Sequence, residues 1–309
     1  MARWPSQCIL VRSTLKGGSG TSWLTPLSAV RDSPLQGGQN RKSLALCGAS
    51  AKGVHTMHIK SVCLQGVATI EIARPEKKNA LSQAMYRAMT ETILDAGADE
   101  SVRALLITGQ PGIFTAGNDL EDFMRTPEIG ADSPVAGFMQ ALLNCDKPVV
   151  AAVTGAAVGI GVTMLLHCDL VYLSDQAQLL LPFVNLGLVP EFGSSLLLPR
   201  LMGHARAAQA LLLGEPIGAA EAVAVGLASA VLPSSDLLAH ARRMAERFNA
   251  LPPGAVRDSK RLLRGATRAA VDRAIQEESA VFTMRLRSPE AREALQAFLQ
   301  KRKPNFTPP

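Results

Sequence analysis

The chain has 309 residues, of which 47% are hydrophobic and 19% charged, which is enough for one large buried core with extensions. Its net charge of +6 comes from residues 1–56, which hold seven basic side chains and one acidic side chain, whereas the remainder is balanced. The body therefore lacks the basic excess expected of a nucleic-acid-binding protein, and its 4% of aromatic residues offers few stacking platforms.

Residues 1–56 are rich in Ser, Gly and Arg, and we expect them to form a disordered or leader extension outside the fold. An Arg- and Ser-rich, acid-poor leader is typical of an organelle transit peptide, but a translated region upstream of a start at Met57 would look the same. The five cysteines and five histidines show no metal-ligand spacing, so we expect no metal. No apolar run is long enough to cross a bilayer.

The first elements of the body are a hairpin and a helix. Two β-rich runs, 59–64 and 67–73, flank Gln65-Gly66, which predicts a hairpin with glycine in its turn. Ser82 can cap a helix that continues to about Ala98, and residues 103–108 predict the next strand.

Two glycine-containing loops follow successive strands. The first, GQPGIFTAGNDLEDF, enters a helix near Asp119; the second contains Gly155, Gly159 and Gly161 after a strand at 149–153, and a helix resumes at 162–167. Glycine admits a ligand close to the backbone, and the first N–H groups of a helix lack partners, so such a turn accepts an oxygen that carries negative charge. The alternative is a close strand-to-helix crossing. The Lys-Ser/Thr pair of a phosphate-binding loop is missing.

Glu191 lies in the turn LVPEFGSS, among almost entirely apolar neighbours. Removal from water raises the pKa of a carboxyl group and makes it a stronger proton acceptor, as a general base requires. The alternatives are a solvent-exposed turn residue, or a carboxylate that accepts backbone N–H bonds at the start of the following helix.

The chain after Glu191 is almost wholly helical by pattern. We expect helices near 194–202, 205–213, 219–225, 236–250, 255–263, 268–286 and 289–302, with a short strand at 228–231. Lys260, Arg261 and Arg264 form a basic helix face, interpreted as a solvated surface or as a contact to ligand phosphate.

The body resembles the crotonase (enoyl-CoA hydratase/isomerase) superfamily from about Met57 to Phe306. The resemblance rests on ARPEKKNALS, FTAGNDL, KPVVAAVTGAAVGIG, CDLVY, LGLVPEFGSS, GEPIGAAEAVAVGLASAVLP and AFLQKRKPNF in this order. It implies an α/β fold in which ββα units form a spiral, here over 57–250, followed by a helical trimerisation region, 251–309. It also implies a homotrimer or a dimer of trimers.

The resemblance further implies that two backbone N–H groups hold the thioester oxygen of an acyl-CoA as an enolate. These donors would be Asn118 and Ile160. Coenzyme A would be part of the substrate, with no separate cofactor. Its contacts are expected at Lys78, Ala80, Leu81, Thr115, Ala116, Gly117, Asp119 and Leu120, with Lys260 reaching phosphate from the same or a neighbouring subunit.

Departures from the family pattern favour one reaction. Hydratases of the family carry two glutamates, and this chain has Thr163 and Phe183 in their places. Glu191 aligns with the single catalytic glutamate of peroxisomal-type Δ3,Δ2-enoyl-CoA isomerases. The resemblance therefore implies an isomerase of fatty acid β-oxidation, with an apolar lining from Phe114, Phe183, Val189 and Phe192.

Two alternatives stay open: a hydratase or other acyl-CoA enzyme of the superfamily, and a non-catalytic acyl-CoA-binding protein. We expect a cytoplasmic protein, or a mitochondrial one if residues 1–56 are a transit peptide.

Overall fold

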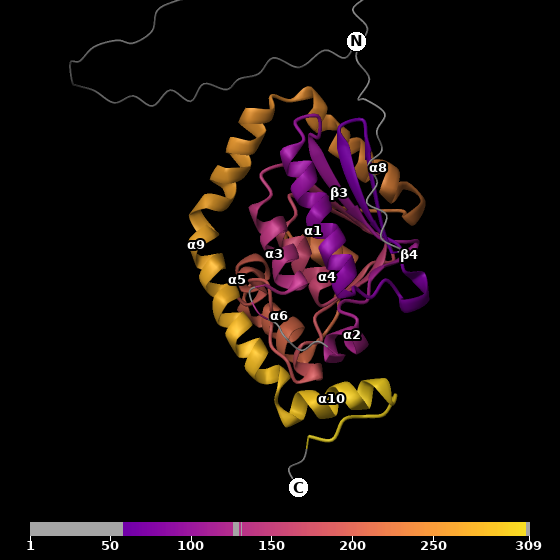
Figure 1. Cartoon of the computed structure of the whole chain (residues 1–309), viewed down its shortest axis with the longest axis vertical. Helices are drawn as coiled ribbons and strands as arrows, with labels where there is room; N and C mark the ends of the chain where they lie inside the picture. The colour runs from indigo at the N-terminus through magenta and orange to yellow at the C-terminus, as the bar shows by residue number, and fades with distance from the viewer. Residues whose placement is uncertain (1–57, 126–129, 131, 307–309) are drawn as a thin grey trace, which may run out of the picture. The chain divides into compact units, whose positions relative to one another are not determined.

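The computed structural model describes residues 58–125, 130 and 132–306. The extension expected at residues 1–56 lies outside the described residues. Ten strands and ten α-helices are found in the described part, with short 3-10 and π turns between them (Figure 1).

The larger sheet has six strands in the order β1-β2-β3-β5-β7-β10. The first two pair antiparallel, and every other neighbouring pair is parallel. The bounds are β1 (Ile59–Leu64), β2 (Val67–Ile72), β3 (Ala104–Thr108), β5 (Val149–Val153), β7 (Leu170–Ser174) and β10 (Ala230–Leu232).

A smaller sheet has four short strands in the order β4-β6-β8-β9. Its bounds are β4 (Gly112–Thr115), β6 (Gly155–Val158), β8 (Gln178–Leu180) and β9 (Ile217–Gly218). The strands β4, β6 and β8 directly follow β3, β5 and β7 of the larger sheet in sequence, and helices or helical turns come after each of these pairs. The chain thus advances as a spiral of ββα units, as the resemblance implies.

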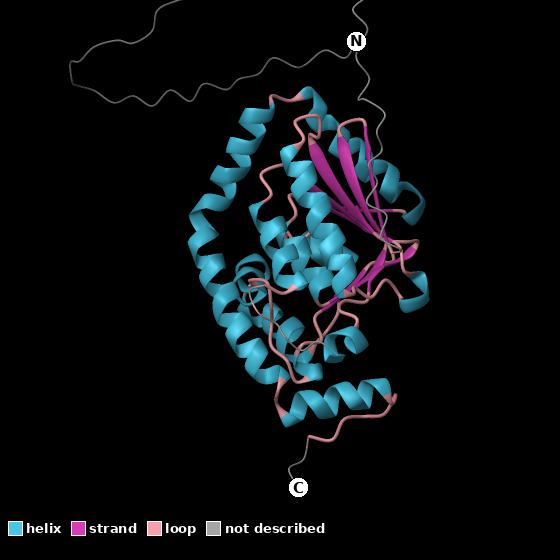
Figure 2. Ribbon diagram, viewed as in Figure 1, coloured by secondary structure: helices cyan, strands magenta, loops and turns pink. Residues whose placement is uncertain are grey.

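Helices flank the larger sheet on both sides (Figure 2). α1 (Gln83–Ala98) and α3 (Pro134–Asn144) pack on one face, where they bury Met85, Met89 and Phe138. α8 (Ser234–Glu246) covers the other face through Leu237 and Ala241. Because both faces are covered, the central strands are apolar throughout rather than alternating.

Shorter helical pieces connect these layers. They are η1 (Pro75–Lys77), α2 (Leu120–Arg125), α4 (Ile160–Thr163), η2 (Met164–His167), η3 (Val184–Leu186), α5 (Ser194–Met202), α6 (His204–Ala208), η4 (Gln209–Leu213), α7 (Ala219–Ala224) and η5 (Arg247–Ala250). The long helix α9 (Pro253–Leu286) runs past α5, and α10 (Pro289–Leu299) follows it (Figure 1). No helix of the described part is long and apolar enough to cross a membrane.

Several sequence predictions are confirmed at the residue level. The hairpin turn has positive φ at Gln65 and Gly66, and the Ser82 side chain accepts the N–H of Met85 at 3.4 Å as the helix cap. The strand expected at 149–153 corresponds to β5.

Other predictions are wrong. The glycine loops at 109–119 and 155–161 contain strands β4 and β6. Each strand has only four residues, and β6 consists mostly of glycine and alanine, so neither gives a strand pattern. The two helices expected at 255–263 and 268–286 are one continuous helix, α9. Gly265 does not interrupt it, because a single glycine costs an exposed helix only about 1 kcal/mol. The separate helical region from residue 251 stays a prediction.

Candidate active site

The two predicted glycine loops lie against each other. A Cβ on Gly117 would come within 2.8 Å of the Val158 carbonyl oxygen, and one on Gly161 would come within 2.5 Å of Thr115 Cγ2. Glycine is therefore required at both positions, because any larger residue would force the loops apart. The close approach brings Asn118 and Ile160 to the wall of the same cavity.

The backbone around Asn118 is fixed by pairing with the loop after β2. The Leu81 N–H donates to the Gly117 carbonyl at 2.8 Å, and the Asp119 N–H donates to the Leu81 carbonyl at 2.9 Å. Asp119 also pairs with Arg74 at 2.7 Å, so this loop is held on two sides. A fixed loop can aim an N–H group without reorganising during a reaction.

The N–H groups of Asn118 and Ile160 have no acceptor among the described residues. Ile160 is the first residue of α4 and follows Gly159, whose φ is +55°. Unpaired N–H groups at a helix start carry partial positive charge. The cavity wall therefore offers two donors to an oxygen atom that gains negative charge.

Glu191 lies on the wall of the same cavity and is 8% exposed. Its Oε1 is buried with no hydrogen-bond partner among the described residues. Burial first, and then the charge of Glu278, raise the pKa of Glu191 to about 8. The structure excludes the alternative of an exposed turn residue and leaves a carboxyl group with unusually high proton affinity.

The turn that carries Glu191 is tightly anchored. Phe192 has φ of +58°, which is uncommon for a residue with a side chain, and its ring stacks on His167 with the centroids 3.9 Å apart. His167 Nε2–H donates to the Phe192 carbonyl at 2.8 Å. Burial lowers the pKa of His167 to about 4, so the ring is neutral at physiological pH. The Ser194 hydroxyl donates to the Glu191 carbonyl at 2.7 Å.

The backbone N–H groups at the start of α5 are accepted by Glu278 rather than by Glu191. Glu278 Oε2 accepts from Gly193 at 2.6 Å, and Oε1 accepts from Ser195 at 2.9 Å. The second alternative for Glu191 is therefore wrong, because another carboxylate has this position. Glu191 is left facing the cavity.

Two cavities meet at Glu191. One, of about 300 Å³, has both N–H donors on its wall and is also lined by Leu186, Phe282, Phe298, Arg302 and Pro304. The other, of about 480 Å³, extends between α3 and α9 and is lined by residues including Met139, Phe192, Ile275 and Phe282. Glu191 is the only acidic side chain among the described residues that line either cavity.

The predicted apolar lining is partly correct. Phe183 and Phe192 line the cavities, as expected. Phe114 is fully buried in the core and does not line either cavity, and neither does Val189. Thr163 is buried one helical turn after Ile160, and its hydroxyl has no partner among the described residues.

The residues expected to contact coenzyme A divide into three groups. Ala116, Gly117 and Leu120 line the cavity. Leu81, Thr115 and Asp119 are buried and shape the loop that bears the Asn118 donor. Lys78 is exposed and Ala80 is half-buried at the edge of this loop.

Lys260 lies away from this group. It is 6% exposed, pairs with Asp169 at 2.8 Å and donates to the Lys147 carbonyl at 2.6 Å. Its ammonium group is thus engaged inside the fold. The interpretation of Lys260 as part of a solvated face is wrong, although Arg261 beside it is exposed.

Sequence reasoning missed four contributors to the site: Tyr86, Glu278, Phe282 and Arg302. The Tyr86 hydroxyl donates to Asn118 Oδ1 at 2.5 Å. Burial, and secondly the charge of Glu191, raise the pKa of Tyr86 well above its usual value, so it stays a neutral donor. The buried positions on α1 gave a helix pattern but no sign that one of them faces Asn118. The closing motif AFLQKRKPNF marked the region of Arg302 without indicating that it lines the cavity.

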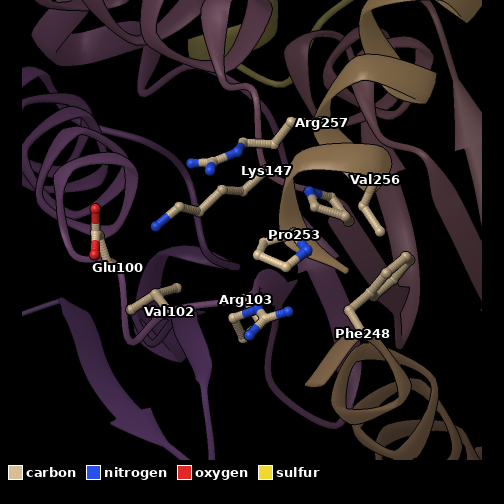
Figure 3. Close-up of a pocket in the computed structure, with 9 residues that line it drawn as sticks. Glu100, Val102, Arg103, Lys147, Phe248, Pro253, Val256 and Arg257 are labelled. Atoms are coloured by element: carbon tan, nitrogen blue, oxygen red, sulfur yellow. The ribbon is translucent and has the colours of Figure 1, made fainter. Parts of the chain in front are cut away.

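A separate cavity of about 180 Å³ lies between the end of α1 and the start of α9 (Figure 3). Arg103, Lys147 and Arg257 surround it, with Glu100 at one side. The Lys147 ammonium donates to the carbonyls of Ala96 and Asp99 at 2.6 and 2.5 Å, and so caps the end of α1. Lys147 therefore has a structural partner, and this cavity shares no residue with the Glu191 site.

Comparisons with known proteins agree with this geometry. Residues 63–309 match the sequence profile of the Enoyl-CoA hydratase/isomerase family. Human enoyl-CoA delta isomerase 2 is 33% identical over 288 residues, which cover 91% of this chain and 70% of that protein. The 2,3-dehydroadipyl-CoA hydratase of Escherichia coli K12 is 32% identical, over 78% of this chain and 95% of that protein.

Among solved structures, Pseudomonas aeruginosa OdaA is 51% identical, with a TM-score of 0.77, over 79% of this chain and 99% of that one. The spiral fold, the pair of N–H donors and the buried carboxylate define an enzyme of the crotonase superfamily, which confirms the predicted fold class. The chain belongs to the enoyl-CoA hydratase/isomerase family, and its relatives include the delta isomerases.

Proposed function

We propose that the protein is a Δ3,Δ2-enoyl-CoA isomerase, which converts a 3-enoyl-CoA into the trans-2-enoyl-CoA. The observation that carries the proposal is the position of Glu191. It is the one acidic side chain among the described residues lining the two cavities, and it shares a cavity wall with the unpaired N–H groups of Asn118 and Ile160.

Movement of a double bond needs one base that acts twice. The Glu191 carboxylate removes a proton from C2, and the electrons move into the thioester carbonyl to form a dienolate. The N–H groups of Asn118 and Ile160 donate to the dienolate oxygen. The protonated carboxyl group then returns the proton to C4, so the double bond moves from C3–C4 to C2–C3 and the enzyme regains its starting form.

Hydration requires a different arrangement. Adding water to a 2-enoyl-CoA needs groups that hold and activate the water, and the family's hydratases use two glutamates for this. By the resemblance, Thr163 and Phe183 take these two places; Thr163 is buried, and Phe183 lines the cavity. Neither side chain is a carboxylate base, which supports isomerisation over hydration although some relatives are hydratases.

The placement of the substrate is part of the proposal. Coenzyme A would lie along Ala116, Gly117 and Leu120 and the exposed edge at Lys78 and Ala80. The acyl chain would enter the cavity of about 480 Å³ between α3 and α9. We also propose a homotrimer or dimer of trimers, and a cytoplasmic location with a mitochondrial one as the alternative.

The pH dependence of isomerisation tests this proposal. Because the pKa of Glu191 is raised to about 8, most of the free enzyme at pH 7 carries the protonated carboxyl group, which cannot act as a base. For trans-3-hexenoyl-CoA, kcat/KM should rise about tenfold per pH unit below pH 8 and level off above it. Initial rates between pH 6 and pH 9.5 measure this profile, with enzyme returned from each pH to pH 7 as the control for inactivation.

A kcat/KM that is flat, or that falls as the pH rises, would contradict Glu191 as the base. Absence of conversion at every pH would contradict the isomerase itself.

A further inference from the structure

We propose that Glu278 is a positioning residue, whose carboxylate fixes the turn that bears Glu191 and places a negative charge near the Glu191 carboxyl group. This inference rests on the proposed function, because it assigns a role to Glu191 as the base. Glu278 lies on α9, 87 positions after Glu191 in the chain, and no sequence motif links the two residues.

The geometry gives Glu278 a direct hold on the turn. It is 7% exposed, and its two carboxylate oxygens accept the N–H groups of Gly193 and Ser195, at 2.6 and 2.9 Å. These residues lie two and four positions after Glu191. Gly193 has φ of +75°, so the turn depends on a backbone shape that few residues adopt. Two charge-assisted hydrogen bonds are strong enough to select that shape.

The hydrogen bonds of Glu278 and Glu191 indicate different roles for the two carboxyl groups. Glu278 uses both oxygens on the backbone and lines neither cavity, whereas Glu191 has a buried oxygen without a partner and lines both. A fixed negative charge near a buried carboxyl group disfavours its ionisation and strengthens it as a proton acceptor.

Other titratable groups around Glu191 do not supply a comparable charge. Tyr86, from α1, is held neutral by its raised pKa, and His167, from η2, is neutral above about pH 4. Asp119, next to Asn118, is paired with Arg74, and Arg302, on the cavity wall, is paired with Glu293. Glu278 is the charged group whose field raises the pKa of Glu191, in addition to burial.

The arrangement also explains why α9 is needed by the site. Phe282, one turn after Glu278, lines both cavities. One helix therefore contributes cavity wall, holds the catalytic turn and provides the charge. Displacement of α9 would alter the base and its surroundings together.

The test compares Glu278→Gln with Glu277→Gln. Glu277 is the exposed neighbour on the same helix, so its substitution removes the same charge without touching the turn. In Glu278→Gln, we expect the acidic limb of the pH profile, which is the rise of kcat/KM below pH 8, to move to lower pH by about one unit. The charge of Glu278 is gone in this variant, while the burial of Glu191 remains. We expect the plateau to fall about tenfold, since glutamine cannot accept both N–H groups. Glu277→Gln should leave both unchanged.

A purely structural residue would lower the plateau and the Tm without moving the limb. A limb that stays in place in Glu278→Gln therefore overturns the assignment. If this variant does not fold, Glu278→Asp gives the test, because it keeps the charge but is too short to reach both N–H groups. Its limb should stay near pH 8 while kcat falls about tenfold; an unchanged kcat overturns the positioning role.

A direct titration separates this inference from the proposed function. Infrared difference spectra of wild type against Glu191→Gln give the midpoint of the Glu191 carboxyl band without any substrate. If the titration midpoint of Glu191 lies at lower pH in Glu278→Gln than in wild type, the inference is supported. This holds even if trans-3-hexenoyl-CoA is not converted, because missing conversion overturns only the isomerase assignment. A midpoint that does not fall overturns the inference whatever the activity.

Discussion

Glu191→Gln should lower kcat for conversion of trans-3-hexenoyl-CoA by about four orders of magnitude. General-base catalysis alone contributes about 10²–10⁴, and here the same carboxyl group serves both proton transfers. Glutamine has nearly the same shape but cannot accept a proton at any pH of the assay. The rate of appearance of the 2-enoyl thioester absorbance measures the loss.

The control for this variant is binding of the substrate. The N–H groups of Asn118 and Ile160 belong to the backbone, and their loops do not depend on the Glu191 side chain. Acyl-CoA should therefore raise the Tm of Glu191→Gln as much as that of wild type. A variant that binds acyl-CoA and keeps most of its turnover would show that Glu191 is not the base.

The same substitution should stabilise the protein at alkaline pH. The pKa of Glu191 is raised from its ordinary 4.5 to about 8 by burial and by Glu278. Between these two pH values the folded state binds more protons at this site than the unfolded state, so the wild type loses stability as the pH rises through this window. The full loss, reached above pH 8, is up to about 5 kcal/mol, since each pKa unit corresponds to about 1.4 kcal/mol.

Glu191→Gln removes this loss because glutamine does not ionise. At pH 5 the wild-type carboxyl group is protonated in the folded state, and the two proteins should have similar Tm values. At pH 9 the variant should melt about 10 °C higher, since 1 kcal/mol corresponds to about 2–4 °C in a domain of this size. Thermal unfolding of both proteins at the two pH values tests this. A Tm difference that is the same at pH 5 and pH 9 would mean that Glu191 is not buried in a charged form.

These opposite effects on activity and stability have one cause. A carboxyl group that is removed from water, and whose Oε1 lacks a hydrogen-bond partner among the described residues, costs free energy of folding and gains proton affinity. The fold tolerates the cost because the turn is anchored through Phe192, Gly193, Ser194 and Ser195 rather than through the Glu191 side chain.

Local sequence patterns predicted those turns, caps and strands that are determined by adjacent residues. The turn at Gln65-Gly66, the cap at Ser82 and the apolar run at 149–153 each depend on a few adjacent residues. The apolar setting of Glu191 was also visible, because proline, phenylalanine and glycine surround it in the sequence. The convergence of the two loops required the resemblance as well, since spacing alone left a structural crossing as an alternative.

The missed features arise from contacts between distant residues. Strands β4 and β6 pair with each other, and a Cβ on Gly155 would meet the Gly112 carbonyl oxygen at 2.1 Å. The pairing therefore requires Gly155, a residue that weakens the strand pattern of β6. Glu278 and Tyr86 occupy helix positions that read as ordinary, and their roles appear only when α9 and α1 are packed against the site.

The most direct test of the central claim is a paired assay of the wild-type chain with trans-3-hexenoyl-CoA and crotonyl-CoA, each supplied separately. Formation or loss of the 2-enoyl thioester absorbance follows both reactions. The isomerase assignment predicts rapid conversion of trans-3-hexenoyl-CoA and little hydration of crotonyl-CoA. Rapid hydration of crotonyl-CoA without isomerisation would contradict it. Because positions 163 and 183 hold no carboxylate, another group of the protein would then have to activate the water.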